Sequence, residues 1–147
     1  MDMKKVLAFF IFFVSASQFA LASGWKQAGN NIYINTNSII PYYNERHETT
    51  ENEYSFWTRH FNDGSAYFKN YEAELKSKIS IIHTRHIINC YDKKITTKTV
   101  LIYDDKSKII SRINKTTDIL QWEEIKTYSQ VDNYYRNICL KQKTYNF

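Results

Sequence analysis

The sequence contains few of the residues that build tight turns and close backbone approaches, with three glycines and one proline among its 147 residues. Because glycine occurs only at positions 24, 29 and 64, neither a G-x-S-x-G nucleophile elbow nor a glycine-rich phosphate-binding loop can form. Cysteine is also scarce. Cys90 and Cys139 show no C-x-x-C spacing, which argues against a redox or metal-binding pair. We therefore predict a chain that is not an enzyme and that uses no metal or cofactor.

Long hydrophobic runs are absent apart from one near the N-terminus. Lys4 and Lys5 precede nine consecutive apolar residues, Val6 to Val14, and Ala20-Leu21-Ala22 offers the small residues that a signal peptidase accepts. Nine residues are too few to span a bilayer, for which a helix needs roughly 20. These features predict a signal peptide at 1–22 and a single exported domain at 23–147. No cysteine sits at the cleavage point, so we expect a periplasmic, cell-surface or secreted product that is not lipid-anchored.

A strong excess of one charge is also missing. Without Lys4, Lys5 and Asp2, the 20 basic and 15 acidic side chains become 18 and 14, a mature net charge of about +4. Lysines alternate with aspartates and glutamates along the chain, which is typical of a solvated surface and not of a nucleic-acid-binding stripe. We expect no nucleic-acid partner, whereas attraction to acidic proteins, polysaccharides or lipid headgroups stays open.

Aromatic and β-branched residues are abundant, and this composition favours strands joined by short polar turns. The clearest pattern is an antiparallel hairpin formed by 79–90 and 95–103 around the polar turn 91–94. Other segments are assigned more briefly: an opening hairpin at 25–35 with its turn at Gly29-Asn30, strands at 53–61 and 108–113, a polar loop at 41–52, a short helix or an irregular connection at 67–76, and a strand or buried turn at 119–125.

The end of the chain changes to a helical period. Ser129 can cap a helix with Asp132 three residues later, and the apolar side chains that follow lie on one stripe: Val131, Tyr134, Tyr135 and Ile138. An exported chain with an even number of cysteines is expected to pair them, so Cys90 and Cys139 would tie the helix end to the sheet. On the chain-entropy model a loop of this length is worth roughly 4 kcal/mol. The predicted fold is α+β: an antiparallel meander of about five or six strands, a C-terminal helix packed on one face, and one disulfide.

Several of these features, taken in order, resemble the surface-adhesin protein E-like family of Gram-negative bacteria. They are the signal peptide, Trp25, the segment Tyr33–Ile39, the aromatic strand at Phe56-Trp57, the strand that ends in Cys90 with basic residues after it, and the helix that ends in Cys139. The resemblance covers nearly the whole mature chain. It implies a small antiparallel sheet with a helix on it, a Cys90–Cys139 disulfide, and a surface protein that binds host extracellular-matrix or serum proteins without catalysis.

The chain departs from the family pattern at two positions. The adhesin branch is lipid-anchored, whereas this sequence lacks the cysteine that anchoring requires. Asn35 stands where an aspartate is expected, so the charge of that residue does not carry over. No motif locates the family's binding residues here. A periplasmic accessory or structural protein without an adhesive role is therefore the alternative interpretation, and its oligomeric state is open.

Few side chains stand out as candidate site residues. His83 and His86 lie three apart, which puts them on opposite faces of a strand and argues against a shared metal. Tyr42 and Tyr43, beside Pro41 in the predicted polar loop, are the candidates for exposed contact residues. The other aromatic residues that we single out, Phe56, Trp57 and Trp122, are expected in the core. The charged run 45–48 and the pairs Asp104-Asp105 and Glu123-Glu124 are expected to be solvated, which leaves a small hydrolase with only scattered acids and histidines to support it.

Overall fold

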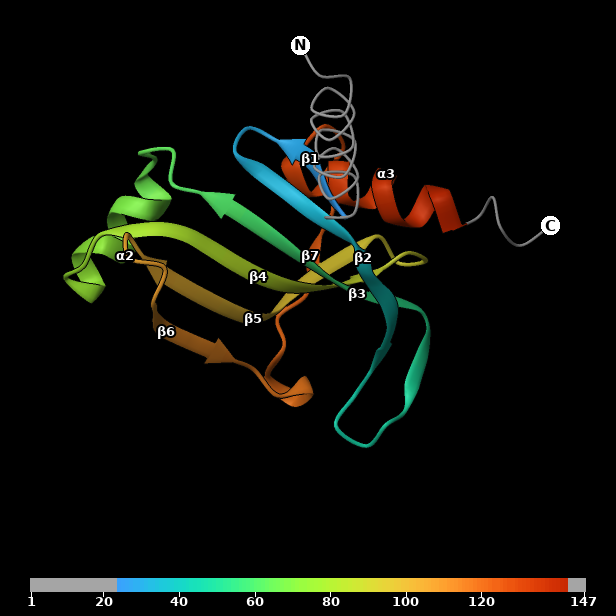
Figure 1. The fold of residues 1–147 in the computed structure, drawn as a ribbon. Helices are drawn as coiled ribbons and strands as arrows, with labels where there is room; N and C mark the ends of the chain where they lie inside the picture. Colours follow the sequence, from blue (N-terminus) through green and yellow to red (C-terminus); the bar gives the residue numbers. More distant parts are fainter. Residues whose placement is uncertain (1–23, 143–147) are drawn as a thin grey trace, which may run out of the picture.

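The sheet is an antiparallel meander in which the first six strands lie side by side in the order in which they occur along the chain (Figure 1). The fold is taken from a computed structural model that describes residues 24–142, so the expected signal peptide at 1–22 lies outside the described residues. The strands are β1 (Trp25–Gly29), β2 (Ile32–Tyr43), β3 (Thr49–Phe61), β4 (Ile79–Asn89), β5 (Lys94–Asp104) and β6 (Ile109–Asn114). A two-residue strand, β7 (Glu123–Glu124), pairs with the start of β5.

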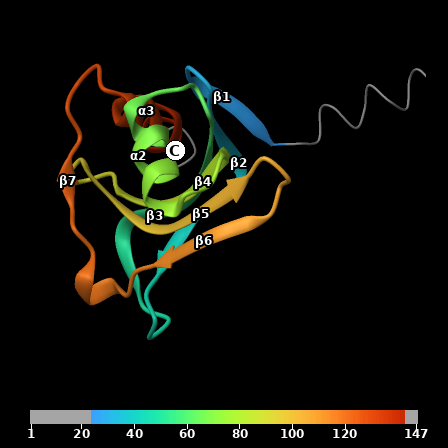
Figure 2. The ribbon, with the colours of Figure 1, turned by 90° about the vertical axis from the view of Figure 1, so that its left-hand side faces the viewer.

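Two helices lie on the inner side of the sheet. They are α2 (Ala66–Leu75) and α3 (Gln130–Gln142), and Figure 2 shows the sheet curling around both of them. The undecided segment 67–76 is therefore helical. Among residues 24–142 no helix is long and apolar enough to cross a membrane.

Alternation along the strands supplies the inner core. One cluster joins Phe56 and Ile88 of the sheet to Tyr134 and Ile138 of α3, and Phe56, Ile88 and Ile138 are all 0% exposed. A second cluster packs Phe68 of α2 against β4 and β5. Burial of this apolar surface is the main stabilising contribution to such a layered fold.

The C-terminal helix follows the predicted pattern. The Asp132 amide donates to Ser129 Oγ at 3.3 Å, which is the expected N-terminal capping contact. Cys139 is 1% exposed, and its sulfur is bonded to that of Cys90, with 5.4 Å between the two Cα atoms. The disulfide therefore joins the end of β4 to α3, as the sequence predicted.

The loop predicted at 41–52 is wrong. Strand β2 continues to Tyr43, β3 begins at Thr49, and these two residues are paired in the sheet. Only 44–48 form the connection, where Asn44 Oδ1 accepts hydrogen bonds from the amides of Arg46 and Glu48 at 2.9 and 3.0 Å. An asparagine side chain that organises its own turn allows polar flanking residues to remain in strands.

A segment made of residues 115–125 runs from β6 to β7 and covers one end of the outer side of the sheet. It contains the short 3₁₀ helix η1 (Thr117–Ile119), so the expectation of a strand or buried turn at 119–125 is met only by the short β7. We call 115–125 the closing segment. The Lys115 amide donates to the Lys98 carbonyl at 2.9 Å, and Thr96 Oγ1 donates to the Gln121 carbonyl at 2.7 Å. Trp122, expected in the core, is 37% exposed because this segment lies outside the sheet.

Candidate functional site

The outer side of the sheet, away from both helices, carries arginines and aromatic rings in three cross-strand rows. We call these rows the arginine face. The residues, taken from strand pairing, are Trp25, Asn35, Trp57, Arg85, Thr99 and Asn114 in the first row; Gln27, Tyr33, Arg59, His83, Leu101 and Arg112 in the second; and Phe61, Ile81, Tyr103 and Ile109 in the third. Side chains that are paired across antiparallel strands point to the same face, so register alone brings six strands of the chain together here.

Arg59 is the centre of the arginine face. Its guanidinium carbon lies 3.7 Å from the centroid of the Trp25 ring and 5.8 Å from that of Phe61. The Phe61 ring in turn meets the Tyr33 ring edge-on, with 5.8 Å between centroids. Cation–π contacts of this kind hold a planar guanidinium in one orientation. Burial lowers the pKa of Arg59 from its usual value, although the group stays charged at neutral pH.

The other two arginines of this face, Arg85 and Arg112, differ in how firmly neighbouring residues hold their side chains. Arg85 Nη2 donates to Ser55 Oγ at 3.2 Å, and Ser55 is 2% exposed, so one end of this guanidinium is fixed. Arg112 is exposed at the edge strand β6. Within the described chain none of Arg59, Arg85 and Arg112 forms an ion pair, whereas ion pairs do occur between Lys98 and Glu45 and between Arg136 and Asp132.

Acidic side chains are missing from this surface. None of the positions in the three rows is an aspartate or glutamate, and His83 is the one further titratable base among them. His83 lies between the Trp25 ring, at 5.9 Å between centroids, and the Tyr103 ring, at 4.9 Å. Burial, and after it the positive charge of Arg59, lowers the pKa of His83. At neutral pH the positive charge of the face therefore comes from the three arginines.

The structure places the two tyrosine candidates differently. Tyr43 is 53% exposed, as expected for a contact residue, and its binding role stays a prediction. The expected exposure of Tyr42 is wrong. Its side chain is 3% exposed, and its hydroxyl shares a 2.7 Å hydrogen bond with Thr117 Oγ1, because the closing segment covers it. A contact 75 residues away along the chain is not visible in the local pattern around Pro41.

The same region holds an ion pair that the sequence did not predict. Lys98 is 7% exposed, and its ammonium donates to Glu45 Oε1 at 2.7 Å and to the Lys115 carbonyl. Glu45 also accepts from the Thr117 amide at 3.0 Å and from the Thr117 hydroxyl at 2.6 Å. The Lys98 hydrogen bond, followed by those from Thr117, lowers the pKa of Glu45 to about 2. Glu45, which we expected to be a solvated loop residue, therefore anchors the closing segment.

His83 and His86 lie on opposite faces, as predicted. His86 is on the inner side, where its ring stacks on Phe56 at 5.3 Å between centroids and its Nε2 shares a 3.1 Å hydrogen bond with Thr58 Oγ1. Burial lowers the pKa of His86 to about 4, so the ring is neutral near pH 7. No group of three or more histidine, cysteine or carboxylate side chains could hold a metal ion in residues 24–142.

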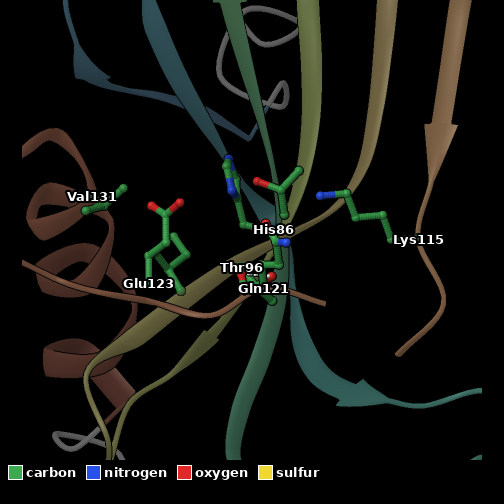
Figure 3. Close-up of a pocket in the computed structure, with 8 residues that line it drawn as sticks. His86, Thr96, Lys115, Gln121, Glu123 and Val131 are labelled. Atoms are coloured by element: carbon green, nitrogen blue, oxygen red, sulfur yellow. Dashed lines mark hydrogen bonds between the residues drawn. The ribbon is translucent and has the colours of Figure 1, made fainter. Parts of the chain in front are cut away.

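A small cavity of about 130 Å³ opens beside His86. It lies along β5 between the stretch paired with β6 and the stretch paired with β7. Figure 3 shows Lys115 and Glu123 on opposite sides of it, with His86, Thr96 and Gln121 between them. The volume is close to that of a cavity that accepts benzene, so this site suits ordered water or a very small polar molecule.

Searches of known structures find the same architecture in protein E of Haemophilus influenzae. One of its structures superposes with a TM-score of 0.54 at 18% sequence identity, covering 81% of this chain and 86% of the other. The crystal structure of protein E from non-typeable Haemophilus influenzae gives a TM-score of 0.55 at 18% identity, covering 84% and 80%. The chain has a protein E-like fold. The resemblance inferred from the order of sequence features is thereby confirmed at the level of the fold.

The sequence comparisons add no second line of support. No family model matches the chain, and no curated protein matches it. At 18% identity the shared architecture does not carry binding residues from one protein to the other. The residues of any site must therefore be argued from this chain's own surface.

Proposed function

We propose that this protein is an exported, non-catalytic binding module that contacts host extracellular-matrix or serum proteins through its arginine face. The observation that carries the proposal is the uncovered row of aromatic rings and arginines on the outer side of the sheet. Aromatic residues and arginine are the side chains most enriched at the energetic centres of protein interfaces. The protein E-like fold and the expected signal peptide support the same interpretation.

Preorganisation adds to the argument. Arg59 is stacked on Trp25, and Arg85 is tied to Ser55, so neither side chain loses much conformational entropy when a partner binds. A rigid sheet face presents these groups at fixed spacings, which mobile loops do not.

The test uses the mature chain, 23–147, with its disulfide formed. Surface plasmon resonance against immobilised human plasma proteins and a solubilised basement-membrane extract should give saturable binding. The matched comparison is a Trp25→Ala, Arg59→Ala double variant against a Lys69→Ala, Lys126→Ala double variant, whose lysines are exposed away from the arginine face. Binding that is absent, or equal in the two double variants, contradicts the proposal.

Location separates the proposal from the alternative of a periplasmic accessory protein. An epitope-tagged copy on intact cells should be degraded by added protease if the module is displayed at the surface. Release of an undegraded protein with the periplasmic fraction would favour the accessory role, in which the arginine face would have a bacterial partner.

A further inference from the structure

We propose that the arginine face recognises an acidic, partly apolar peptide segment of its partner, with carboxylates at Arg85 and Arg112 and apolar side chains over the neighbouring rings. This inference depends on the proposed function only in taking the partner to be a protein. It specifies the chemical character of the bound segment and names the residues that contact it.

Charge complementarity is the first argument. The three rows contain Arg59, Arg85 and Arg112 and no carboxylate, although the whole chain has 15 acidic side chains. These three rows therefore carry positive charge without a carboxylate, whereas other cations of the described chain do pair with carboxylates, as Lys98 does with Glu45 and Arg136 with Asp132. A surface of one sign favours partners of the opposite sign and accelerates their association.

Unsatisfied hydrogen-bonding capacity is the second argument. Arg59 Nε is buried and has no hydrogen-bond partner within residues 24–142. A guanidinium has five donors in a planar fork that matches a carboxylate. In the free protein the Trp25 ring covers one face of the Arg59 guanidinium, and no carboxylate within residues 24–142 forms an ion pair with it. Because Arg59 Nε is itself buried, carboxylates brought by a partner would instead contact the accessible donors of Arg85 and of the exposed Arg112.

The third row of the arginine face favours a peptide over a uniformly polar polyanion as the bound ligand. Phe61, Ile81, Tyr103 and Ile109 make it an apolar stripe beside the arginine row, and Ile109 is 38% exposed. Rows two residues apart along a strand are separated by about 7 Å. A segment with acidic and apolar side chains at neighbouring positions can satisfy both rows, whereas a sulfated polysaccharide would leave the apolar stripe against charged groups.

The experiment measures binding of short fluorescein-labelled peptides to the mature protein by fluorescence anisotropy. The probe peptide combines glutamate, aspartate and leucine. Comparison peptides replace the acids by their amides, the acids by lysine, or the leucines by serine, and a heparin fragment tests polysaccharide. We expect the acidic, leucine-containing peptide to bind most tightly and added salt to weaken it. Arg112→Glu, at an exposed position, should weaken this binding roughly tenfold, the amount that corresponds to one strong charge contact.

Two further variants make the result decisive. Arg85→Gln combined with Arg112→Glu should weaken binding more than either change alone, while Lys69→Glu combined with Lys126→Glu should change it little. Thermal unfolding checks that each variant is folded, and Arg112→Glu keeps the test valid if the Arg85 change is not tolerated. Equal affinity for the amide peptide, tighter binding of heparin, or unaltered binding by Arg112→Glu overturns the inference.

The outcomes also separate this inference from the proposed function. If host proteins bind but the acidic peptide does not, the partner chemistry is wrong and the module function stands. If the peptide binds through the arginines but no plasma or matrix protein does, the recognition chemistry stands and the host-binding function is wrong.

Discussion

The two faces of the same strands have opposite characters. On the inner face Phe56, Ile82 and Ile88 are at most 1% exposed and pack beneath the helices. On the outer face residues at alternate positions, such as Trp57 and Arg59, are only partly buried, and the Arg59 guanidinium stacks on the Trp25 ring. The inner layer resembles the interior of any small domain, while the outer layer holds unpaired cations among aromatic rings. A half-buried sheet can therefore use one face for stability and the other for recognition.

The two histidines show this difference within one strand. His86 is neutral, stacked on Phe56, and hydrogen-bonded to Thr58. His83 lies in a basic aromatic layer, where burial and, after it, the charge of Arg59 lower its pKa. Three positions of separation thus change the neighbours of a histidine completely, because successive side chains of a strand alternate between faces.

The largest loss of stability is expected when Phe56 on the inner face is replaced, and the adjacent Trp57 on the outer face provides the comparison. Phe56→Ala removes a ring that contacts His86 and Tyr134, at 5.3 and 5.6 Å between centroids, and should lower the free energy of unfolding by about 3–5 kcal/mol. Trp57→Ala, on the partly exposed face, should lower it by about 1–2 kcal/mol. Urea denaturation of both variants measures the difference. Equal losses would mean that the outer face is as much a core as the inner one.

Removal of the disulfide is expected to have the next largest effect. Cys90→Ala with Cys139→Ala releases a link across 49 residues and should lower the free energy of unfolding by about 2–4 kcal/mol. Because the link lies on the inner side, peptide binding by the arginine face should persist under conditions in which the variant is folded. An unchanged denaturation midpoint under non-reducing conditions would show that α3 is held by packing alone.

Local patterns were sufficient to predict much of the fold. The β4–β5 hairpin has two long apolar runs around a polar turn, and α3 has a capping serine followed by a helical stripe, so both signals lie within a few residues. The disulfide followed from export and an even cysteine count. Signals of this kind need no knowledge of distant contacts.

The candidate site depends on information that no single segment contains. Arg59 and Arg112 enter one row only through the register of three successive strand pairs, two of which contain a bulge or irregularity. A bulge changes which face a side chain occupies, so the row cannot be deduced from alternation. Tyr42 was misplaced for a related reason, since its burial depends on Thr117 in a remote segment.

The pH dependence of stability should differ between variants of the two histidines. The folded-state pKa of His86 is about 4, below the value of about 6.5 in an unfolded chain, so the unfolded state binds more protons between these values. The free energy of unfolding should therefore fall as pH decreases from about 6.5 to 4, by up to about 3 kcal/mol. Urea denaturation across this range, for the natural protein and for His86→Gln and His83→Gln, measures the contribution of each ring.

Other titratable groups lie near His86 or in the same region of the sheet. Lys115 and Glu123 line the cavity beside His86, and Glu45 has a pKa of about 2, so its ion pair with Lys98 weakens only at lower pH. His86→Gln should remove most of the dependence between pH 6.5 and 4, and His83→Gln much less. A larger effect of His83→Gln would place the more strongly desolvated histidine on the outer face.

The smallest effect on stability is expected for a substitution of Arg59. This variant tests whether the outer face serves binding or stability. Arg59→Gln loses a cation–π contact with Trp25, worth about 0.5–1 kcal/mol at such sites, but it also removes an unpaired, partly buried charge and an unsatisfied Nε. The two changes oppose each other, so the free energy of unfolding should shift by less than about 1 kcal/mol. Binding of the acidic peptide should nevertheless weaken clearly in the same variant. A loss of stability comparable to that of Phe56→Ala, with binding unchanged, would show that Arg59 supports the fold and that the partner contacts another surface.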